Sequence, residues 1–364
     1  IGTSNIALGV AALKSNTVAY GNIGIGTNAL SSNTTGTSNI AIGSNALSSS
    51  TTSSDNIALG SSTLFNNTTG YSNIGMGNNT LLSNTTGYNN IGIGINTLYN
   101  NTTGFINIGI GNNSLHSNTT GSANIAMGAY TLTNNTTGEI NTAIGTGALN
   151  ANTTGRNNVA VGHYALYHNT TGDENMGMGN SFLHNNTTGK ANVGIGMSVL
   201  YHNTTGSKNI GFGNYALHQN TVGIGNIAIG EESIHLNTSG KGNIGIGIGT
   251  LYKNIAGDYN IALGNGAMAV NTTGNYNIGL GAYVLNTNTT GQHNIGQGIF
   301  ALHSNATGNN NIAFGNKSGD WIKGNSNIHI GSEYIQNVTS ELDNVVAIGN
   351  GIHQGNLNTN TAND

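Results

Sequence analysis

One motif recurs along the chain every 17 residues, and this repeat constrains the fold more than any other feature. The pentad Asn-Ile-(Ala/Gly)-Ile-Gly, with conservative variants, begins at Asn5 and Asn22 and continues without a slip to Asn311, which gives 19 copies. So short a unit cannot bury a core alone, so the strict register indicates units that stack on one another. We number the positions of a unit from this Asn, so that Asn90 stands at position one and Ile106 at position seventeen.

Large and small residues alternate at the start of each unit. Position two is usually Ile, position four is almost always a large apolar residue, position three is Ala or Gly, and position five is Gly. A period of two is typical of a β-strand, which Ile and Val favour. We expect a second short strand at positions eight and nine, where position nine is nearly always Leu. The large residues at positions two, four and nine are expected to point inward.

The remaining positions carry turn chemistry. Positions twelve to fifteen usually read Asn-Thr-Thr-Gly, in which Asn tolerates left-handed backbone and Gly supplies a positive φ. The sequence therefore predicts an all-β fold, a β-solenoid (parallel β-roll) of 17-residue coils that pair through their backbones about 4.8 Å apart. Stacked coils would align the Asn residues of position one into a ladder of hydrogen-bonded amides.

The composition agrees with such a stack and excludes several classes of protein. Only 5% of the residues are charged and none is proline; a charge repeated in every coil would repel itself, and a proline would remove a ladder donor. The absence of cysteine excludes disulfides and Cys-ligated zinc. A net charge of −4 offers no basic surface for nucleic acid.

Position three is unusual for a strand, because it carries only Ala or Gly in the 19 copies. Small residues let another backbone approach closely. We therefore expect this face to pack against identical chains, with an oligomer packing face that includes Ala7, Ala41, Ala126, Ala160 and Ala313.

The pentad at residues 39–43 (Asn-Ile-Ala-Ile-Gly) and at 158–162 (Asn-Val-Ala-Val-Gly) resembles the head repeats of YadA-like trimeric autotransporter adhesins. The longer unit is similar to repeats of phage and virus tail fibres and of related bacterial surface proteins, and residues 324–331 are similar to a run near the end of such regions. The resemblance covers about residues 1–349. It implies a left-handed roll that forms a homotrimer through the strand bearing the motif, although the YadA-like period is shorter than 17. It lies in the repeat alone, so it does not imply autotransport or self-cleavage.

The regular pattern breaks near the end of the sequence. We expect residues 1–315 to form the solenoid of about nineteen repeats, 316–350 to form irregular final coils that act as a cap or transition, and 351–364 to be a polar tail. The next copies are expected to start near Asn327 and Asn344. Trp321, the only tryptophan, lies in the irregular part, and a receptor-binding tip is the alternative there.

Aromatic and imidazole side chains gather at position ten. They could form a ladder that covers the Leu core, fill a groove between chains, or contact sugar rings; a metal column is disfavoured because acidic partners are missing. The candidates for glycan or inter-chain contact are Tyr99, His116, Tyr167, His184, Tyr201, His218, His235 and Tyr252, together with Trp321. Phe65 and His303 share position ten, and His168 and His202 lie beside it at position eleven.

No arrangement of residues indicates catalysis. The Gly-x-Gly runs recur along the whole array and no helix is expected after them, so they do not predict a nucleotide site. Carboxylate pairs are few, and we expect no enzyme activity, cofactor or metal. The Asn-Thr-Thr segments match the N-glycosylation sequon, and the sequence leaves open whether they carry glycans or are simply turns.

These observations predict an extracellular structural fibre shaft that mediates attachment, in a phage or virus tail fibre or a bacterial surface adhesin. Its expected partners are copies of itself and a cell-surface glycan, without nucleic acid or membrane insertion, and its expected location is the cell surface or a virion. One alternative is a self-polymerising extracellular filament. A second is an ice-binding solenoid with Thr ladders at positions thirteen and fourteen, although adjacent Thr residues face opposite sides of an extended chain.

Overall fold

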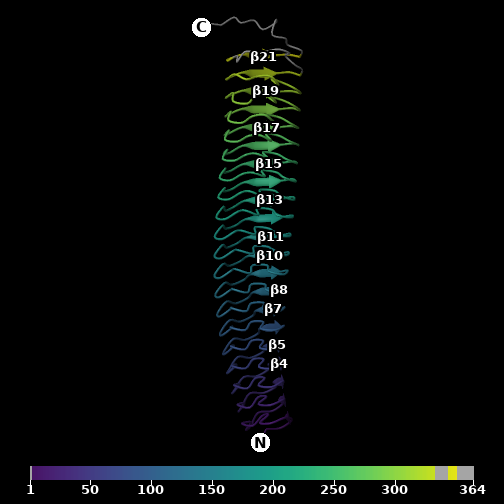
Figure 1. The fold of residues 1–364 in the computed structure, drawn as a ribbon, viewed down its shortest axis with the longest axis vertical. Helices are drawn as coiled ribbons and strands as arrows, with labels where there is room; N and C mark the ends of the chain where they lie inside the picture. The colour runs from purple at the N-terminus through teal and green to yellow at the C-terminus, as the bar shows by residue number, and fades with distance from the viewer. Residues whose placement is uncertain (1, 333–342, 351–364) are drawn as a thin grey trace. The chain divides into compact units, whose positions relative to one another are not determined.

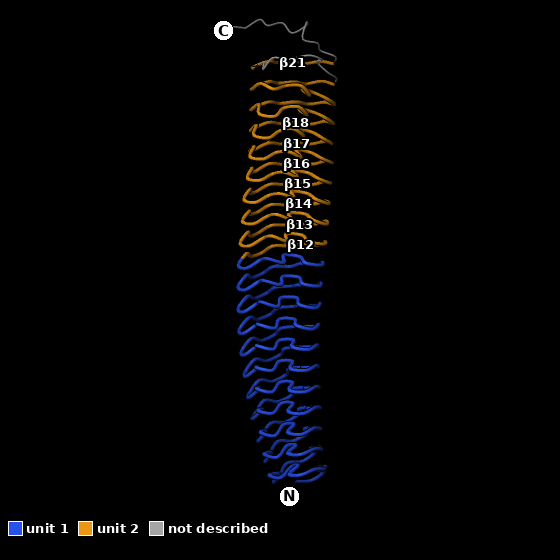
Figure 2. The backbone as a smooth tube through the Cα atoms, in the orientation of Figure 1, with its two compact units in different colours: residues 1–188 blue, residues 189–364 orange. Residues whose placement is uncertain are grey.

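The computed structural model describes residues 2–332 and 343–350, and these form an all-β parallel β-solenoid with roughly 17 residues per turn. No helix occurs among them. The chain divides into two compact units, residues 1–188 and 189–364 (Figure 2). The predicted all-β solenoid class is thus confirmed.

Each coil contributes one strand of three residues, and within each unit the strands lie one above another (Figure 1). Neighbouring coils pair in parallel in strict register, so that Ile91 pairs with Ile74 and with Ile108. The strands of the first unit are β1 Ile6–Leu8, β2 Ile23–Ile25, β3 Ile40–Ile42, β4 Ile57–Leu59, β5 Ile74–Met76, β6 Ile91–Ile93, β7 Ile108–Ile110, β8 Ile125–Met127, β9 Thr142–Ile144, β10 Val159–Val161 and β11 Met176–Met178. Those of the second unit are β12 Val193–Ile195, β13 Ile210–Phe212, β14 Ile227–Ile229, β15 Ile244–Ile246, β16 Ile261–Leu263, β17 Ile278–Leu280, β18 Ile295–Gln297, β19 Ile312–Phe314, β20 Ile328–Ile330 and β21 Val346–Ile348.

The predicted second strand at positions eight and nine is wrong. In the coil that starts at Asn90, Asn96 at position seven and Leu98 at position nine have φ angles of 54° and 52°. Two left-handed residues so close together cannot belong to an extended strand. They turn the chain back on itself, and the turn inserts the Leu98 side chain into the coil, where it is fully buried.

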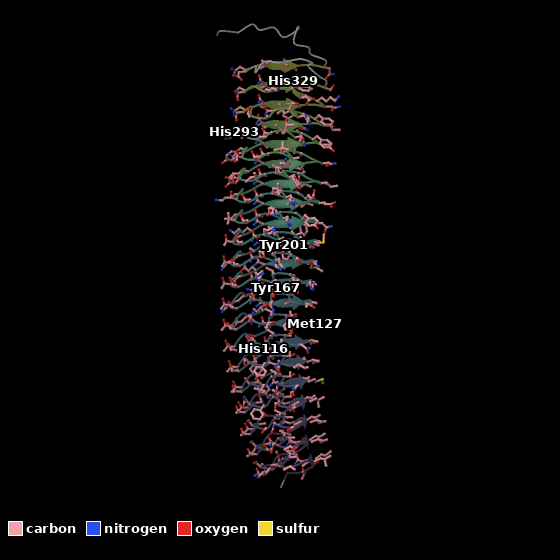
Figure 3. The ribbon with its side chains drawn as sticks, viewed as in Figure 1. His116, Met127, Tyr167, Tyr201, His293 and His329 are labelled. Atoms are coloured by element: carbon pink, nitrogen blue, oxygen red, sulfur yellow. The ribbon has the colours of Figure 1, made fainter. Side chains whose placement is uncertain are left out.

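The predicted direction of the strand side chains is also wrong, because the small residues point inward and the large ones outward. Ala41, Ala126, Ala160 and Ala313 at position three are 0% exposed within their own chain, so they do not form a free face for other chains. Ala7, in the first coil, is exposed. The large residues at position four lie on the surface. Two examples are Ile93, which is 38% exposed, and Met127, which is labelled in Figure 3.

The narrow interior explains why only small residues occupy position three. A Cβ added to Gly92 would lie 2.6 Å from Cγ2 of Thr80, the position-eight residue of the preceding coil. Where position eight is larger the conflict is worse, since a Cβ on Gly177 would lie 2.0 Å from the ring of Phe182. In these coils, packing inside the coil against position eight leaves no room for a side chain at position three.

Two ladders of buried Asn side chains follow the interior. The position-one ladder is confirmed: Nδ2 of Asn90 donates to Oδ1 of Asn73 at 3.1 Å and to the carbonyl of Gly104 at 2.9 Å. The position-twelve ladder was not predicted. There, Nδ2 of Asn101 donates to Oδ1 of Asn84 at 2.8 Å and to Gly104 at 3.0 Å.

The position-twelve ladder changes the interpretation of the Asn-Thr-Thr-Gly segment. Neither Asn101 nor Gly104 has a positive φ. Glycine is needed at position fifteen because a Cβ on Gly104 would lie 2.4 Å from Oδ1 of Asn101 and 2.4 Å from the carbonyl oxygen of Gly121. The predicted left-handed turn is therefore wrong, and the segment is a close crossing of stacked backbones.

The final coils lose the regular interval but keep the fold. Asn327 lies 16 residues after Asn311 and continues the amide ladder, with its Nδ2 3.0 Å from Oδ1 of Asn311. The next coil starts at Val345, one residue after Asn344, near which it was predicted; the Val345 amide donates to Oδ1 of Asn327 at 2.9 Å. The Asn ladder therefore ends at Asn327. The predicted tail at 351–364 lies outside the described residues.

Candidate functional site

The side chains of position ten form half-buried stacks along each unit. In the first unit the rings of Tyr99 and His116 are 5.1 Å apart and nearly parallel, and those of Tyr167 and His184 are 5.4 Å apart. In the second unit Tyr201, His218, His235 and Tyr252 form one continuous stack with spacings of 5.0–5.4 Å. Figure 3 labels His116, Tyr167 and Tyr201 of this column.

Polar residues of this column also satisfy a backbone carbonyl of the preceding coil. Nδ1 of His218 lies 3.1 Å from the carbonyl oxygen of Ser198, and Nδ1 of His235 lies 3.2 Å from that of Tyr215. The side-chain amides of Asn150 and Asn286 make the equivalent bond in coils whose position ten is not aromatic. The carbonyl belongs to position seven, where the left-handed turn takes it out of the strand ladder, so position ten caps that turn.

Burial lowers the pKa of imidazoles in this column and of His168 beside it. Desolvation lowers the pKa of His116. Desolvation and then the nearby His184 lower the pKa of His168. Desolvation and His218 lower the pKa of His235, and its hydrogen bond to Tyr215 and the charge of Glu232 oppose them. These imidazoles are neutral near pH 7, as stacking without repulsion requires.

This geometry supports a structural role for position ten over the predicted sugar contact. The stack covers both faces of His218 and His235, so those faces are closed to a sugar ring. No group of three or more His or acidic residues that could hold a metal occurs among the described residues. Glycan contact at this column stays a prediction, restricted by the structure to ring edges.

The column ends in a contact between His303 and Asp320 within the irregular coils. Nδ1 of His303 lies 3.5 Å from Oδ1 of Asp320, which takes position ten in the next coil. Burial raises the pKa of Asp320, and His303, Lys317 and Ser304 act in the opposite direction. Trp321 follows and is exposed; no ring contact involves it in the described part of the chain. The structure therefore leaves its predicted role as a contact residue untested.

A buried histidine replaces the small residue of position three in β20. His329, labelled in Figure 3, fits because Ser318 below it is small, and its Nδ1 lies 2.8 Å from Ser318 Oγ. Its Nε2 is buried with no hydrogen-bond partner among the described residues. Desolvation lowers its pKa. Among the described residues, His329 is the only titratable side chain at position three.

The most extensive outward feature is a pair of apolar columns that sequence reasoning placed inside. On the outer face of the sheet in both units, Ile, Leu, Met, Val and Phe recur at position four, which is exposed in most coils, and Ile or Val at position two, which is half-buried in most coils. The strand period identified these columns, but it could not tell which of the two alternating faces is inside. The crowding at position three supplies that information, and it is visible only in three dimensions.

The Thr residues of positions thirteen and fourteen have different environments. Oγ1 of Thr102, at position thirteen, donates to the carbonyl of Thr119 at 3.0 Å in the next coil and is half-buried. Thr103, at position fourteen, is exposed. The exposed surface thus holds one Thr column, as the sequence argument against a paired array anticipated.

The buried ladder also bears on the glycosylation sequon. The Asn of each Asn-Thr-Thr segment stands at position twelve, and its Nδ2, the atom that would carry a glycan, is buried and donates two hydrogen bonds, as in Asn118 and Asn135. A glycan cannot be accommodated there in the folded chain. These segments are structural.

The described residues contain no membrane-spanning helix. Compared with known proteins, the chain matches no family model, and no curated protein matches it in sequence.

Proposed function

We propose that this protein is a structural fibre shaft that acts outside the cell in attachment and assembles from copies of itself, as a homotrimer, through the outer face of its strands. The observation that carries the proposal is the pair of apolar columns at positions two and four. Contiguous apolar surface of this extent marks an interaction site in soluble proteins.

A second copy of the same chain fits this surface better than an unrelated partner. The columns repeat at the coil spacing, and only another array with the same spacing can match them over many coils. The surroundings are polar and almost uncharged, with 5% charged residues in the chain, so copies can approach without strong repulsion. Three chains around a common axis would cover the columns of each, which agrees with the trimer implied by the YadA-like resemblance.

The role that we propose for this shaft is mechanical. The interior is filled by amide ladders and Leu side chains, and most coils repeat the same bonds, so the proposed shaft gains length with few new types of contact. The self-polymerising filament and the ice-binding solenoid remain alternatives, and the second has only one exposed Thr column in its favour.

The mass of the assembly in solution tests the proposal. Analytical ultracentrifugation of the wild-type chain should give a discrete trimer. A triple variant, Ile93→Lys, Met127→Lys and Ile144→Lys, should be monomeric with an unchanged circular dichroism spectrum, because these side chains lie outside the coil. The control, Tyr130→Lys, removes a more exposed apolar residue from a turn and should remain trimeric. A monomeric wild type, or a triple variant that stays trimeric, would contradict the strand-face interface; fibres of indefinite length would favour the filament.

A further inference from the structure

A second aromatic column lies on the surface of the second unit, away from position ten. At position seventeen, the rings of Tyr259 and Tyr276 are 5.4 Å apart, and those of Tyr276 and His293 are 5.1 Å apart, all nearly parallel. Tyr259 is 52% exposed and Tyr276 is 51% exposed. In the view of Figure 3, His293 lies toward the edge of its unit and Tyr201 of position ten lies nearer the middle. These three rings do not cover the Leu core, so packing does not explain them.

Polar side chains run beside these rings at position sixteen. Oδ1 of Asp258 accepts a hydrogen bond from the backbone amide of Lys241 at 2.7 Å. Oδ1 of Asn275 accepts one from the backbone amide of Asp258 at 2.6 Å. These bonds fix both side chains. The other oxygen of Asp258 and the amide nitrogen of Asn275 make no further hydrogen bond within the described residues. Gln292 continues the column in the next coil and is exposed.

The surface is open at one end of the aromatic column. Position seventeen is Gly225 and then Gly242 in the two coils before Tyr259. A Cβ added to Gly225 would meet no atom within 4 Å, and one added to Gly242 would meet only the Tyr259 ring among the nearest atoms. No side chain of position seventeen therefore covers the face of Tyr259 that looks toward these glycines.

We propose that this surface, formed by Tyr259, Tyr276 and His293 with Asp258, Asn275 and Gln292, binds a neutral polysaccharide in an extended conformation that runs along the solenoid axis. Vicinal sugar hydroxyls match fixed carboxylate and amide groups, which can accept and donate hydrogen bonds in pairs. The tyrosine hydroxyls and ring edges add one contact per coil, and the open face of Tyr259 takes a terminal pyranose by stacking. The ring spacing is close to the length of one residue of an extended β-linked chain, so successive sugars meet successive coils.

The charge of the strip favours a neutral ligand. Lys241 and Asp258 stand in successive coils and carry opposite charges, and Asn275 and Gln292 carry none. An anionic polysaccharide would meet the Asp258 carboxylate without a matching row of cations. The proposal deepens the attachment role proposed above by naming the class of surface that the shaft contacts.

The test is binding of cellohexaose and chitohexaose by isothermal titration calorimetry with the full chain. The wild type should bind at least one of the two. The variant Tyr259→Ala with Tyr276→Ala should bind it at least about tenfold more weakly, since two aromatic contacts are lost. The control Tyr130→Ala removes an isolated tyrosine that is 53% exposed and should bind as the wild type does. Circular dichroism should show that both variants are folded.

Other outcomes separate this site from its alternatives. Absence of binding by the wild type, or equal binding by the double variant, would overturn the proposal. Loss of binding on replacing Tyr201 and Tyr252 instead would assign the sugar contact to position ten and would also overturn it. The strand-face triple variant of the assembly experiment should bind the oligosaccharide even as a monomer, so failure of the trimer and failure of this site are distinguishable.

Discussion

The inner and outer sides of one strand carry residues of opposite size, and the larger ones are outside. In β6, Gly92 points into the coil, and Ile93 lies on the surface. The inner side is filled by Leu98 and by the amides of Asn90 and Asn101. The outer side repeats apolar residues that are half-buried at position two and mostly exposed at position four, as Ile91 and Ile93 are. Polar ladders and a single Leu thus hold each coil together from inside, and in our proposal the apolar strand residues on the outer side bind a second copy of the chain.

The largest expected effect comes from the Leu of the turn. Leu98→Ala should lower the free energy of unfolding by about 3–5 kcal/mol, because a fully buried side chain is lost from an interior that cannot collapse around the cavity. Urea unfolding followed by circular dichroism measures the change. A cost below about 1 kcal/mol would mean that the Leu column is not the core of the coil.

Loss of one amide from the position-one ladder should cost somewhat less. Asn90→Ala removes the acceptor of the Asn107 backbone amide and both donors of the Asn90 side chain. A buried backbone donor without a partner costs about 1–3 kcal/mol, so we expect a loss of about 2–3 kcal/mol in the same urea experiment. Asn100→Ala in the same coil, at a half-buried position eleven, is the control and should change the stability little. Equal effects of the two variants would contradict a structural role for the ladder.

The sequence predicts only those features of the fold that the 17-residue register determines. Seventeen-residue periodicity fixes which residues stack, and this is why the position-one amide ladder could be predicted. The periodicity does not determine which face of the strand is inside, because the alternation of Ile91 and Gly92 is the same whether the large or the small residues point inward. The left-handed turn at Leu98 was unpredictable for another reason, since a Leu with a positive φ is disfavoured locally and is stabilised only by the burial that follows.

The candidate sites, too, were only partly predictable from the sequence. The aromatic residues of position ten could be recognised as a column, but their bonds to the position-seven carbonyls depend on the turn that the sequence did not reveal. The column of Tyr259 and Tyr276 could have been found by comparing position seventeen across coils, where two glycines precede three rings. Their exposure, which separates them from position ten, required the structure.

The buried imidazole of His329 allows a test of the interior by pH. Its pKa in the folded chain lies below the unfolded value of 6.5 because burial disfavours the charged form. The unfolded chain therefore binds the proton first, and stability present above about pH 6.5 is lost as the pH falls through the folded pKa, at up to about 1.4 kcal/mol per pH unit for one proton. His329→Ala, the residue that other coils use at position three, should remove this loss. The difference between the unfolding free energies of variant and wild type should grow from pH 7 to pH 5, and a constant difference would show that His329 is not neutral and buried.

The smallest expected effect on the stability of the chain itself lies on the outer side of the same coil as Leu98. Ile93→Ala removes apolar atoms that are already partly in water, so the free energy of unfolding of the dissociated chain should fall by less than about 1 kcal/mol. Urea unfolding at protein concentrations where both the wild type and Ile93→Ala sediment as monomers measures this term without the interface. At higher protein concentration the same substitution should cost more, because it then also weakens the proposed contact between copies. A loss as large as that of Leu98→Ala in the dissociated chain would place Ile93 in the core and would remove the argument that the outer columns exist to bind another chain.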